Sequence, residues 1–191
     1  MKKLFSSLMV ASLLLTGCTA KGQKSVTDQA LEYLNTIKKA DYTVIYSDEP
    51  NGLVVVSTPE IETITVKVGE KITSNYSVAR HASTYRAAVT ECLEQVLHDY
   101  SLDAAEFANY FSEFWTEVSY EEFLDKGAKD ALIEVTVNKH SYATDVECIK
   151  LIANNFLKND IQVQGNITFP SGDAFYFRTI PSIGSYTYMG I

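Results

Sequence analysis

The sequence predicts an α+β fold, in which an antiparallel sheet is built from hairpins and helices pack on one face of it. Three observations support this class. Short β-rich segments flank turn residues near both ends of the chain, helical apolar stripes fill the middle, and the order helix–strand–turn–strand occurs twice. Helices grouped between hairpins are typical of α+β proteins.

The first of the two units begins with a helix. Thr27 is its expected N-cap, and apolar residues fall on one face up to about residue 40. The β-rich residues 42–47 and 53–57 flank Pro50-Asn51-Gly52, whose turn chemistry predicts a hairpin. Further strands are expected at residues 64–68 and 72–78.

The middle of the chain is expected to be helical. Residues 84–100 carry a broad apolar face, and Ser101 is placed to cap a second helix that continues to residue 118. Ser119 and Glu122 have the spacing of a capping box, which predicts a shorter helix that stops near residue 127.

The C-terminal part repeats the opening pattern. A strand is expected at residues 131–138, and a capping box at Thr144 predicts a helix that continues to about residue 157. Strands follow at 161–169 and 174–180, and the tail either frays or adds an edge strand. The repetition is compatible with duplication and with coincidence, because caps and turns use few residue types.

The amino terminus has the layout of an export signal. Lys2 and Lys3 precede residues 4–14, an apolar run too short to span a bilayer as a helix. The run ends in Leu15-Thr16-Gly17-Cys18, which resembles the lipobox of bacterial lipoproteins. The resemblance implies cleavage before Cys18, attachment of diacylglycerol to its sulfur, and often acylation of the new amino terminus with a chain such as palmitate. The alternative is an uncleaved segment that ends in a free cysteine.

This resemblance divides the chain into three parts. We expect a signal peptide (residues 1–17), a lipidated tether (18–26) and a single extracytoplasmic α+β domain (27–191). The expected location is the outer face of the cell membrane, where lipid on Cys18 supplies the anchor. Thirteen of the 16 basic residues are lysines, which favours a Gram-positive host.

Charge limits the possible partners. After residue 17 the chain has 14 basic and 24 acidic residues. This acidic excess argues against binding to nucleic acid and against binding to anionic lipid through a cluster of basic residues. The remaining partners are membrane lipid through Cys18 and either an envelope protein or a small ligand.

Cys92 and Cys148 are the other two cysteines. An extracytoplasmic location permits a disulfide between them, and the alternative is two thiols that pack as small apolar residues. Both fall in or beside helical apolar stripes, which does not decide the pairing.

An aromatic run at residues 107–123 is the most conspicuous feature of the middle segment. Aromatic residues at helical spacing usually form core, and an exposed stripe would instead bind a partner or a sugar-like ligand. Trp115 lies towards the edge of the stripe, so it is the best single candidate for a partner contact.

Motifs for catalysis, metal ions and cofactors were not found. The three histidines have no metal-ligand spacing, and neither a nucleophile motif nor a glycine-rich phosphate loop occurs. We therefore expect no cofactor and a non-catalytic binding or interaction domain. The alternatives are an envelope hydrolase that uses a pair of carboxylates and a structural spacer lipoprotein.

Overall fold

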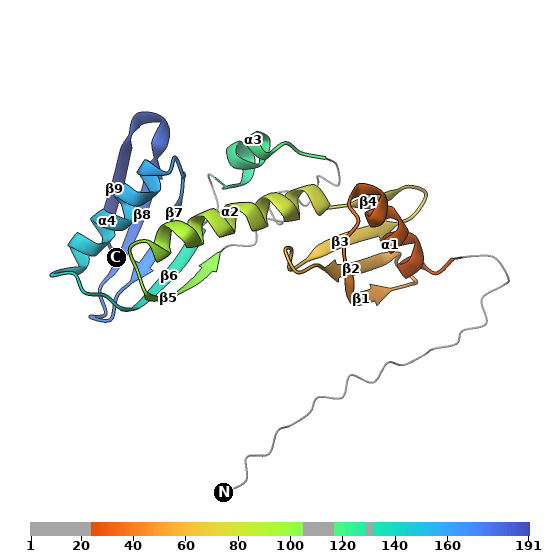
Figure 1. Ribbon diagram of the computed structural model, residues 1–191, viewed down its shortest axis with the longest axis horizontal. Coiled ribbons are helices and arrows are strands. Elements are labelled where there is room, and N and C mark those ends of the chain that lie inside the picture. Colours follow the sequence, from red (N-terminus) through yellow and green to blue (C-terminus); the bar gives the residue numbers. More distant parts are fainter. Residues whose placement is uncertain (1–23, 105–116, 129–131) are drawn as a thin grey trace, which may run out of the picture.

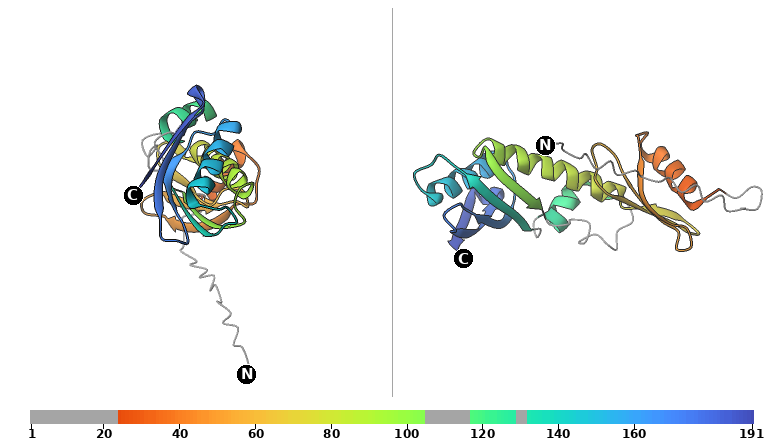
Figure 2. Two further views of the ribbon diagram at one scale, coloured as in Figure 1. Left: turned by 90° about the vertical axis from the view of Figure 1, so that its left-hand side faces the viewer. Right: turned by 90° about the horizontal axis from the view of Figure 1, so that it is seen from below.

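The computed structural model describes residues 24–104, 117–128 and 132–191. In these residues the chain forms two lobes, each with its own sheet, joined by the long helix α2 (Tyr76–Glu94). Helix α2 runs along the long axis of the molecule, with one sheet towards each end (Figures 1 and 2). The α+β class is confirmed, and the expectation of a single domain stays a prediction.

The first lobe pairs a helix with a four-stranded antiparallel sheet. Its strands lie in the order in which they occur along the chain, so each is joined to the next by a short turn. Gly52, in the first turn, has φ +66°, a conformation that favours glycine. The elements of this lobe are α1 (Val26–Ile37), β1 (Thr43–Asp48), β2 (Leu53–Ser57), β3 (Ile64–Val68) and β4 (Ile72–Ser74).

The N-cap of α1 lies two residues earlier than the sequence predicts. The N-cap is Ser25, whose hydroxyl accepts a hydrogen bond from the amide of Asp28 at 3.0 Å. Thr27 lies inside the helix, and its hydroxyl contacts the hydroxyl of Ser47 at 2.8 Å. The Glu49 carboxylate accepts a hydrogen bond from the amide of Val26 at 2.9 Å, so β1 and α1 are joined at this end.

The core of the first lobe lies between α1 and one face of its sheet. Ala30 and Leu34 of the helix are fully buried there. Helix α2 contributes Tyr76 and Ala79 to the same cluster. The buried strand and loop residues are Val54, Val56, Ile61, Ile64 and Val66.

Helix α2 starts earlier and ends earlier than predicted. The expected strand at 72–78 stops at Ser74, and the helix begins at Tyr76 and ends at Glu94 instead of residue 100. Asn75 separates the two elements, because its side-chain oxygen accepts a hydrogen bond from the amide of Thr65 on β3. Val78 lies two turns before Tyr85 on the same buried stripe.

The second lobe has a five-stranded sheet in the order β5-β6-β7-β8-β9. Strands β6 and β7 are parallel, because α4 connects them and returns the chain to the same end of the sheet. The sequence predicts only antiparallel pairs, so this pair is a difference from the expectation. The other three pairs are antiparallel. The elements are β5 (Asp99–Ala104), β6 (Leu132–Lys139), α4 (Asp145–Lys158), β7 (Gln164–Thr168), β8 (Ala174–Ile180) and β9 (Ser185–Gly190).

Strand β5 replaces the start of a predicted helix. Ser101 does not cap a helix but pairs with Thr136 in the ladder between β5 and β6. Pairing with a strand more than 30 residues away overrides the local capping signal. The rest of that predicted helix, up to residue 116, falls outside the described residues, and Val118 is not helical.

Ser119 and Thr144 are confirmed as N-caps. The hydroxyls of Ser119 and Thr144 accept hydrogen bonds from the amides of Glu122 and Glu147, each at 3.1 Å. Helix α3 (Tyr120–Phe123) continues as a single π turn (Leu124–Ala128). The tail adds the edge strand β9, one of the two outcomes expected for it.

Helices cover one face of the second sheet. Along β6 the side chains alternate between exposed and buried, and the buried residue Ile133 belongs to the second core together with residues of α2 and α4. Gly165 on β7 pairs with Ile133, and a Cβ at this position would lie 1.9 Å from the Ile133 carbonyl oxygen. Only glycine allows the two strands to approach this closely.

Candidate functional site

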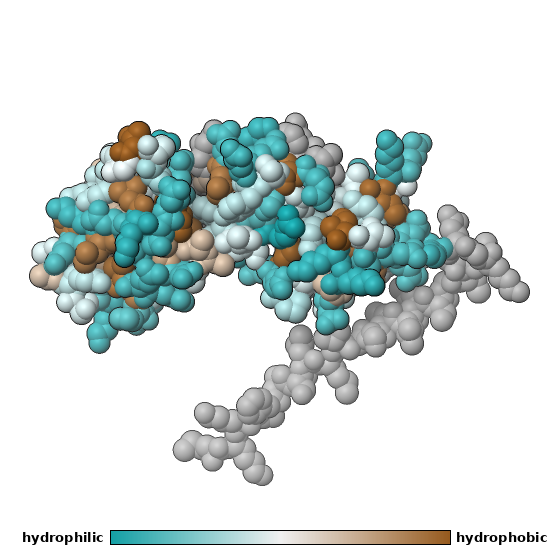
Figure 3. All heavy atoms as spheres, turned by 45° about the horizontal axis from the view of Figure 1, so that its top comes forward, coloured by the Kyte–Doolittle hydropathy of each residue, from teal (hydrophilic) through white to brown (hydrophobic). Residues whose placement is uncertain are grey.

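Strand β1 is exposed along nearly its whole length. Val44, Ile45 and Tyr46 are 40, 56 and 51% exposed, although they are large apolar residues that follow one another in the chain. On the face seen in Figure 3, hydrophobic residues form separate small groups among hydrophilic ones. The other exposed large apolar residues in the described part of the chain are not adjacent in sequence, so the consecutive run on β1 stands out, and such a run is typical of an interaction surface.

The position of β1 in its sheet leaves one side of its backbone unpaired. It is the terminal strand of the first sheet, and its outer edge pairs with no strand in the described part of the chain. The register with β2 shifts at Ile45, between the pairs Val44–Val56 and Tyr46–Val55. A bulge of this kind limits indiscriminate edge pairing.

Acidic residues flank the exposed strand. Asp41 precedes it, Asp48 is its last residue, and Glu49 follows directly. Two of these carboxylates also have local partners, because Asp48 accepts a hydrogen bond from the side chain of Asn51 and Glu49 caps α1. The strand therefore presents an apolar centre between two negatively charged ends.

A small pocket lies beside the residues that lead into β1. It has a volume of about 230 Å³ and is formed by three segments that are distant in sequence. These are the chain that follows α1, the loop between β2 and β3, and the first residue of α2. The lining residues are 38–41, 58–61 and Tyr76.

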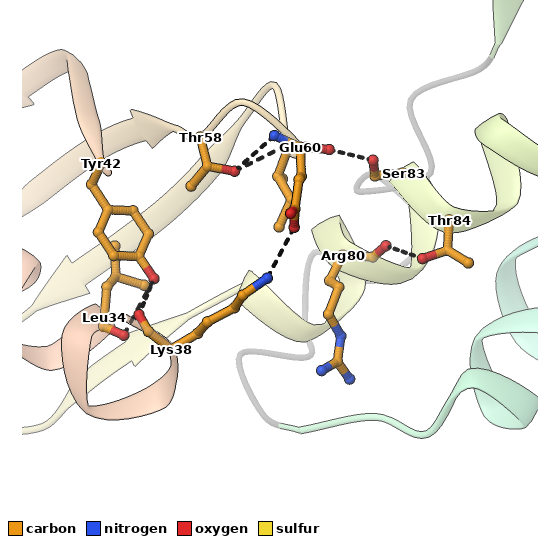
Figure 4. Close-up of polar contacts among 9 residues, drawn as sticks. Leu34, Lys38, Tyr42, Thr58, Glu60, Arg80, Ser83 and Thr84 are labelled. Atoms are coloured by element: carbon orange, nitrogen blue, oxygen red, sulfur yellow. Dashed lines mark hydrogen bonds and ion pairs between the residues drawn. The ribbon is translucent and has the colours of Figure 1, made fainter. Parts of the chain in front are cut away.

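Hydrogen bonds fix two walls of the pocket. The Tyr42 hydroxyl donates to the carbonyl of Lys38 at 2.7 Å and so closes the end of α1. The Thr58 hydroxyl accepts from the amides of Glu60 and Ile61, which shapes the loop (Figure 4). The Ser83 hydroxyl of α2 donates to the Glu60 carbonyl and holds the loop against the helix.

An ion pair crosses the pocket. The ammonium of Lys38 lies 2.9 Å from the carboxylate of Glu60 (Figure 4), and both side chains are about half exposed or more. The hydrogen bond and the charge of Glu60 raise the pKa of Lys38 above its usual value, Tyr76 adds to this, and nearby Arg80 opposes it. The Arg80 guanidinium points away from the ion pair (Figure 4).

Tyr76 contributes a nearly buried residue with a polar group to the pocket lining. The residue is only 3% exposed, and no described residue hydrogen-bonds to its hydroxyl. In the described part of the chain the one fully buried side-chain polar atom that lacks a partner is Nε of Arg178. The Tyr76 hydroxyl therefore keeps some contact with solvent, and the residue is part of the pocket lining.

Two clusters combine a serine with a histidine, and the second also includes an acid; the polar groups of both have structural partners. Ser77 and His81 lie one turn apart on α2, and both contact the backbone of Val118 at 2.8–3.1 Å. In the second cluster the Asp145 carboxylate lies between His140 Nε2, at 2.6 Å, and the hydroxyl of Ser171. In neither cluster does the hydroxyl bond to the imidazole, which is the contact that would activate it as a nucleophile.

The remaining predicted residues fall into two groups. Cys92 on α2 and Cys148 on α4 are buried in the core of the second lobe as free thiols, remote from the pocket lining. Burial raises the pKa of both, and that of Cys148 reaches about 12 with help from Asp145 and Glu147. Cys18 and Trp115 lie outside the described residues, so their predicted roles stay predictions.

The pocket and the exposed strand were not predicted as sites. The sequence analysis predicts a strand at Tyr76, whereas the structure has the first residue of α2 there. The helical apolar stripe that includes Tyr85 extends back to Val78, and this extension was the signal for an earlier helix start. The pairing of Lys38 with Glu60 has no local signal, since it joins two loops 22 residues apart. The sequence shows the consecutive apolar residues of β1, but it does not show that they are exposed.

Comparison with known proteins adds no family: no family model, no curated protein and no solved structure matches the chain. Among the described residues, no helix is long and apolar enough to cross a bilayer. Within the same residues, no group of three or more histidine, cysteine and acidic side chains is arranged to hold a metal ion.

Proposed function

We propose that this protein is a lipid-anchored extracytoplasmic domain that holds a partner protein at the membrane, without catalysis of its own. The observation that carries the proposal is the exposed apolar run on β1, whose outer edge is unpaired in the described part of the chain. Such an edge accepts an additional strand through main-chain hydrogen bonds, and apolar side chains on it supply affinity.

The lipobox supports a location close to the bilayer. Cys18 is eight residues from Val26, where α1 begins, and a chain of that length spans at most about 30 Å. The start of α1 is therefore held within that distance of the lipid headgroups, and the first lobe, with β1, lies next to it. A partner that meets β1 is an envelope protein with a segment in the same zone.

Charge specifies what kind of segment it is. The apolar centre of β1 lies between Asp41 at one end and Asp48 and Glu49 at the other. The complementary occupant is an extended segment with β-branched or other apolar residues and with lysine or arginine at its ends. A second copy fits poorly, because antiparallel pairing centred on Ile45 would place Asp41 of one copy opposite Glu49 of the other.

Hydrogen exchange with two designed peptides tests this proposal. The probes are acetylated and amidated Lys-Val-Thr-Val-Thr-Val-Lys and the same peptide with glutamate at both ends. Added to the full-length protein in detergent, the basic peptide should slow exchange of the outward-facing β1 amides by about 10-fold, because added hydrogen bonds close them to water. The acidic peptide should leave them unchanged.

Matched variants complete the experiment. Ile45→Lys places a charge in the apolar centre and should abolish the protection. Met189→Lys changes a residue of the same 56% exposure on the edge of the other sheet and should leave it intact. Equal protection by the two peptides, or none by either, contradicts the proposal.

A further inference from the structure

The pocket beside α1 has a balance of charge that the rest of the chain lacks. Its lining residues include two lysines, Lys38 and Lys39, and two acidic residues, Asp41 and Glu60. The chain after residue 17 has ten more acidic than basic residues. A locally neutral lining with both signs of charge is complementary to a ligand that also carries both.

The ion pair retains bonding capacity on both of its members. Lys38 uses one ammonium hydrogen for Glu60 Oε2, at 2.9 Å, and Oε1 of Glu60 has no partner among the described residues. A zwitterion laid across this pair would direct its carboxylate to Lys38 and its ammonium to Glu60. An α-amino acid bears both groups on one carbon, so their separation is close to that of the pair itself.

Tyr76 supplies the third contact. The residue is only 3% exposed and lines the pocket, and its hydroxyl has no partner in the described part of the chain. It also lies close enough to the Lys38 ammonium to add, after Glu60, to the rise in the pKa of that lysine. A hydroxyl next to an ammonium is a suitable pair of donors for one carboxylate.

Size and apolar surface limit the ligand further. A volume of about 230 Å³ is below the range of about 300–1,000 Å³ that drug-sized ligands occupy. Ala40, Pro59 and Ile61 line the rest of the pocket and suit a small apolar side chain. We propose that this pocket binds a small zwitterion, a free amino acid or a dipeptide, through Lys38, Glu60 and Tyr76. The inference is independent of the surface on β1.

A thermal-shift screen of the full-length protein in detergent tests the inference. The probes are the twenty amino acids and the dipeptides of alanine with each of them, at 10 mM. A ligand that binds only the folded state raises the melting temperature, so at least one probe should do so. The N-acetylated and C-amidated forms of that probe each lose one charge and should bind at least about 10-fold more weakly by calorimetry.

Variants of pocket residues and a matched control test whether the probe binds in this pocket. Tyr76→Phe removes a hydroxyl without a protein partner, so the fold should keep its stability while affinity for the probe falls about 10-fold. Glu60→Gln should weaken binding similarly. Glu62→Gln, in the same loop but paired with Arg86, is the matched control and should bind as the wild type does. The inference is overturned if no probe raises the melting temperature, if blocked forms bind as tightly as the parent, or if Tyr76→Phe and Glu60→Gln both bind normally.

Discussion

The Ser77 hydroxyl and the Val118 backbone exchange two hydrogen bonds: the hydroxyl donates to the carbonyl at 2.8 Å and accepts from the amide at 3.1 Å. His81 contacts the same carbonyl at 2.9 Å. All three residues are buried, so these bonds replace the water that the Val118 backbone would otherwise need. They hold the segment before α3 against α2, between the two lobes.

Ser77→Ala should therefore lower the unfolding free energy of the protein. The change leaves the buried amide of Val118 without a partner, and the expected loss is about 2 kcal/mol of unfolding free energy. Ser83→Ala on the same helix removes a more exposed hydrogen bond and should cost less than about 1 kcal/mol. Denaturant unfolding of the two variants measures both, and equal losses would contradict the role given to Ser77.

Gly165→Ala should disrupt the parallel pair. The added Cβ would lie 1.9 Å from the Ile133 carbonyl oxygen and 2.7 Å from its side chain, so β7 has to move away from β6. The expected loss is at least about 2 kcal/mol of unfolding free energy. Gly190→Ala on β9 meets nothing within 4 Å and should change stability by less than about 0.5 kcal/mol. If both variants unfold like the wild type, the register of β6 and β7 is wrong.

The two buried thiols should be unreactive in the folded protein. Burial raises the pKa of Cys92, which lowers its thiolate fraction, and takes that of Cys148 to about 12, so almost no Cys148 thiolate is present at pH 8. A thiol reagent at pH 8 should modify them only as fast as the protein unfolds. An increase of two daltons on reduction would instead reveal a disulfide between them and contradict their description as free thiols.

The same pKa shifts predict weaker folding in alkali. The folded state keeps the Cys148 proton to a higher pH than the unfolded state, whose thiol has its ordinary value near 9. This contribution to stability is complete below about pH 9 and is lost as the pH rises towards 12. Cys148→Ala should reduce the fall in unfolding free energy over that range, and an unchanged fall would contradict the assignment to this thiol.

Lipidation should depend on Cys18 alone. In cells supplied with an alkyne-labelled palmitate, the wild type should incorporate label and fractionate with membranes. Cys18→Ser should lose both properties, because only a thiol forms the thioether that carries the lipid. Thr19→Ser, a change at the next residue, should keep both, and label on the Cys18→Ser protein would refute the lipobox interpretation.

Local patterns predicted the elements whose partners are close in sequence. The hairpin of β1 and β2, the caps at Ser119 and Thr144, and helix α4 follow from turn residues, capping spacing and apolar periodicity. These signals act over a few residues, so the sequence displays them completely. The predicted boundaries differ from the observed ones mainly where a distant strand competes.

Tertiary contacts decided what local patterns could not. Strand β5 forms because it pairs with β6, which follows it more than 20 residues later in the chain. The start of α2 depends on the hydrogen bond between Asn75 and β3. The pocket combines three segments that only the folded chain brings together. Exposure of β1 depends equally on the fold, because the terminal place of this strand in its sheet is not encoded within the strand itself.

The most direct test of the account is photo-crosslinking of the lipidated full-length protein in living cells. A photoreactive amino acid replaces Ile45 in one variant and the equally exposed Met189 in another. The account predicts that position 45, and not position 189, crosslinks to an envelope protein, through an extended segment with lysine or arginine beside apolar residues. The same products from both positions, or a second copy of this chain at position 45, would contradict it.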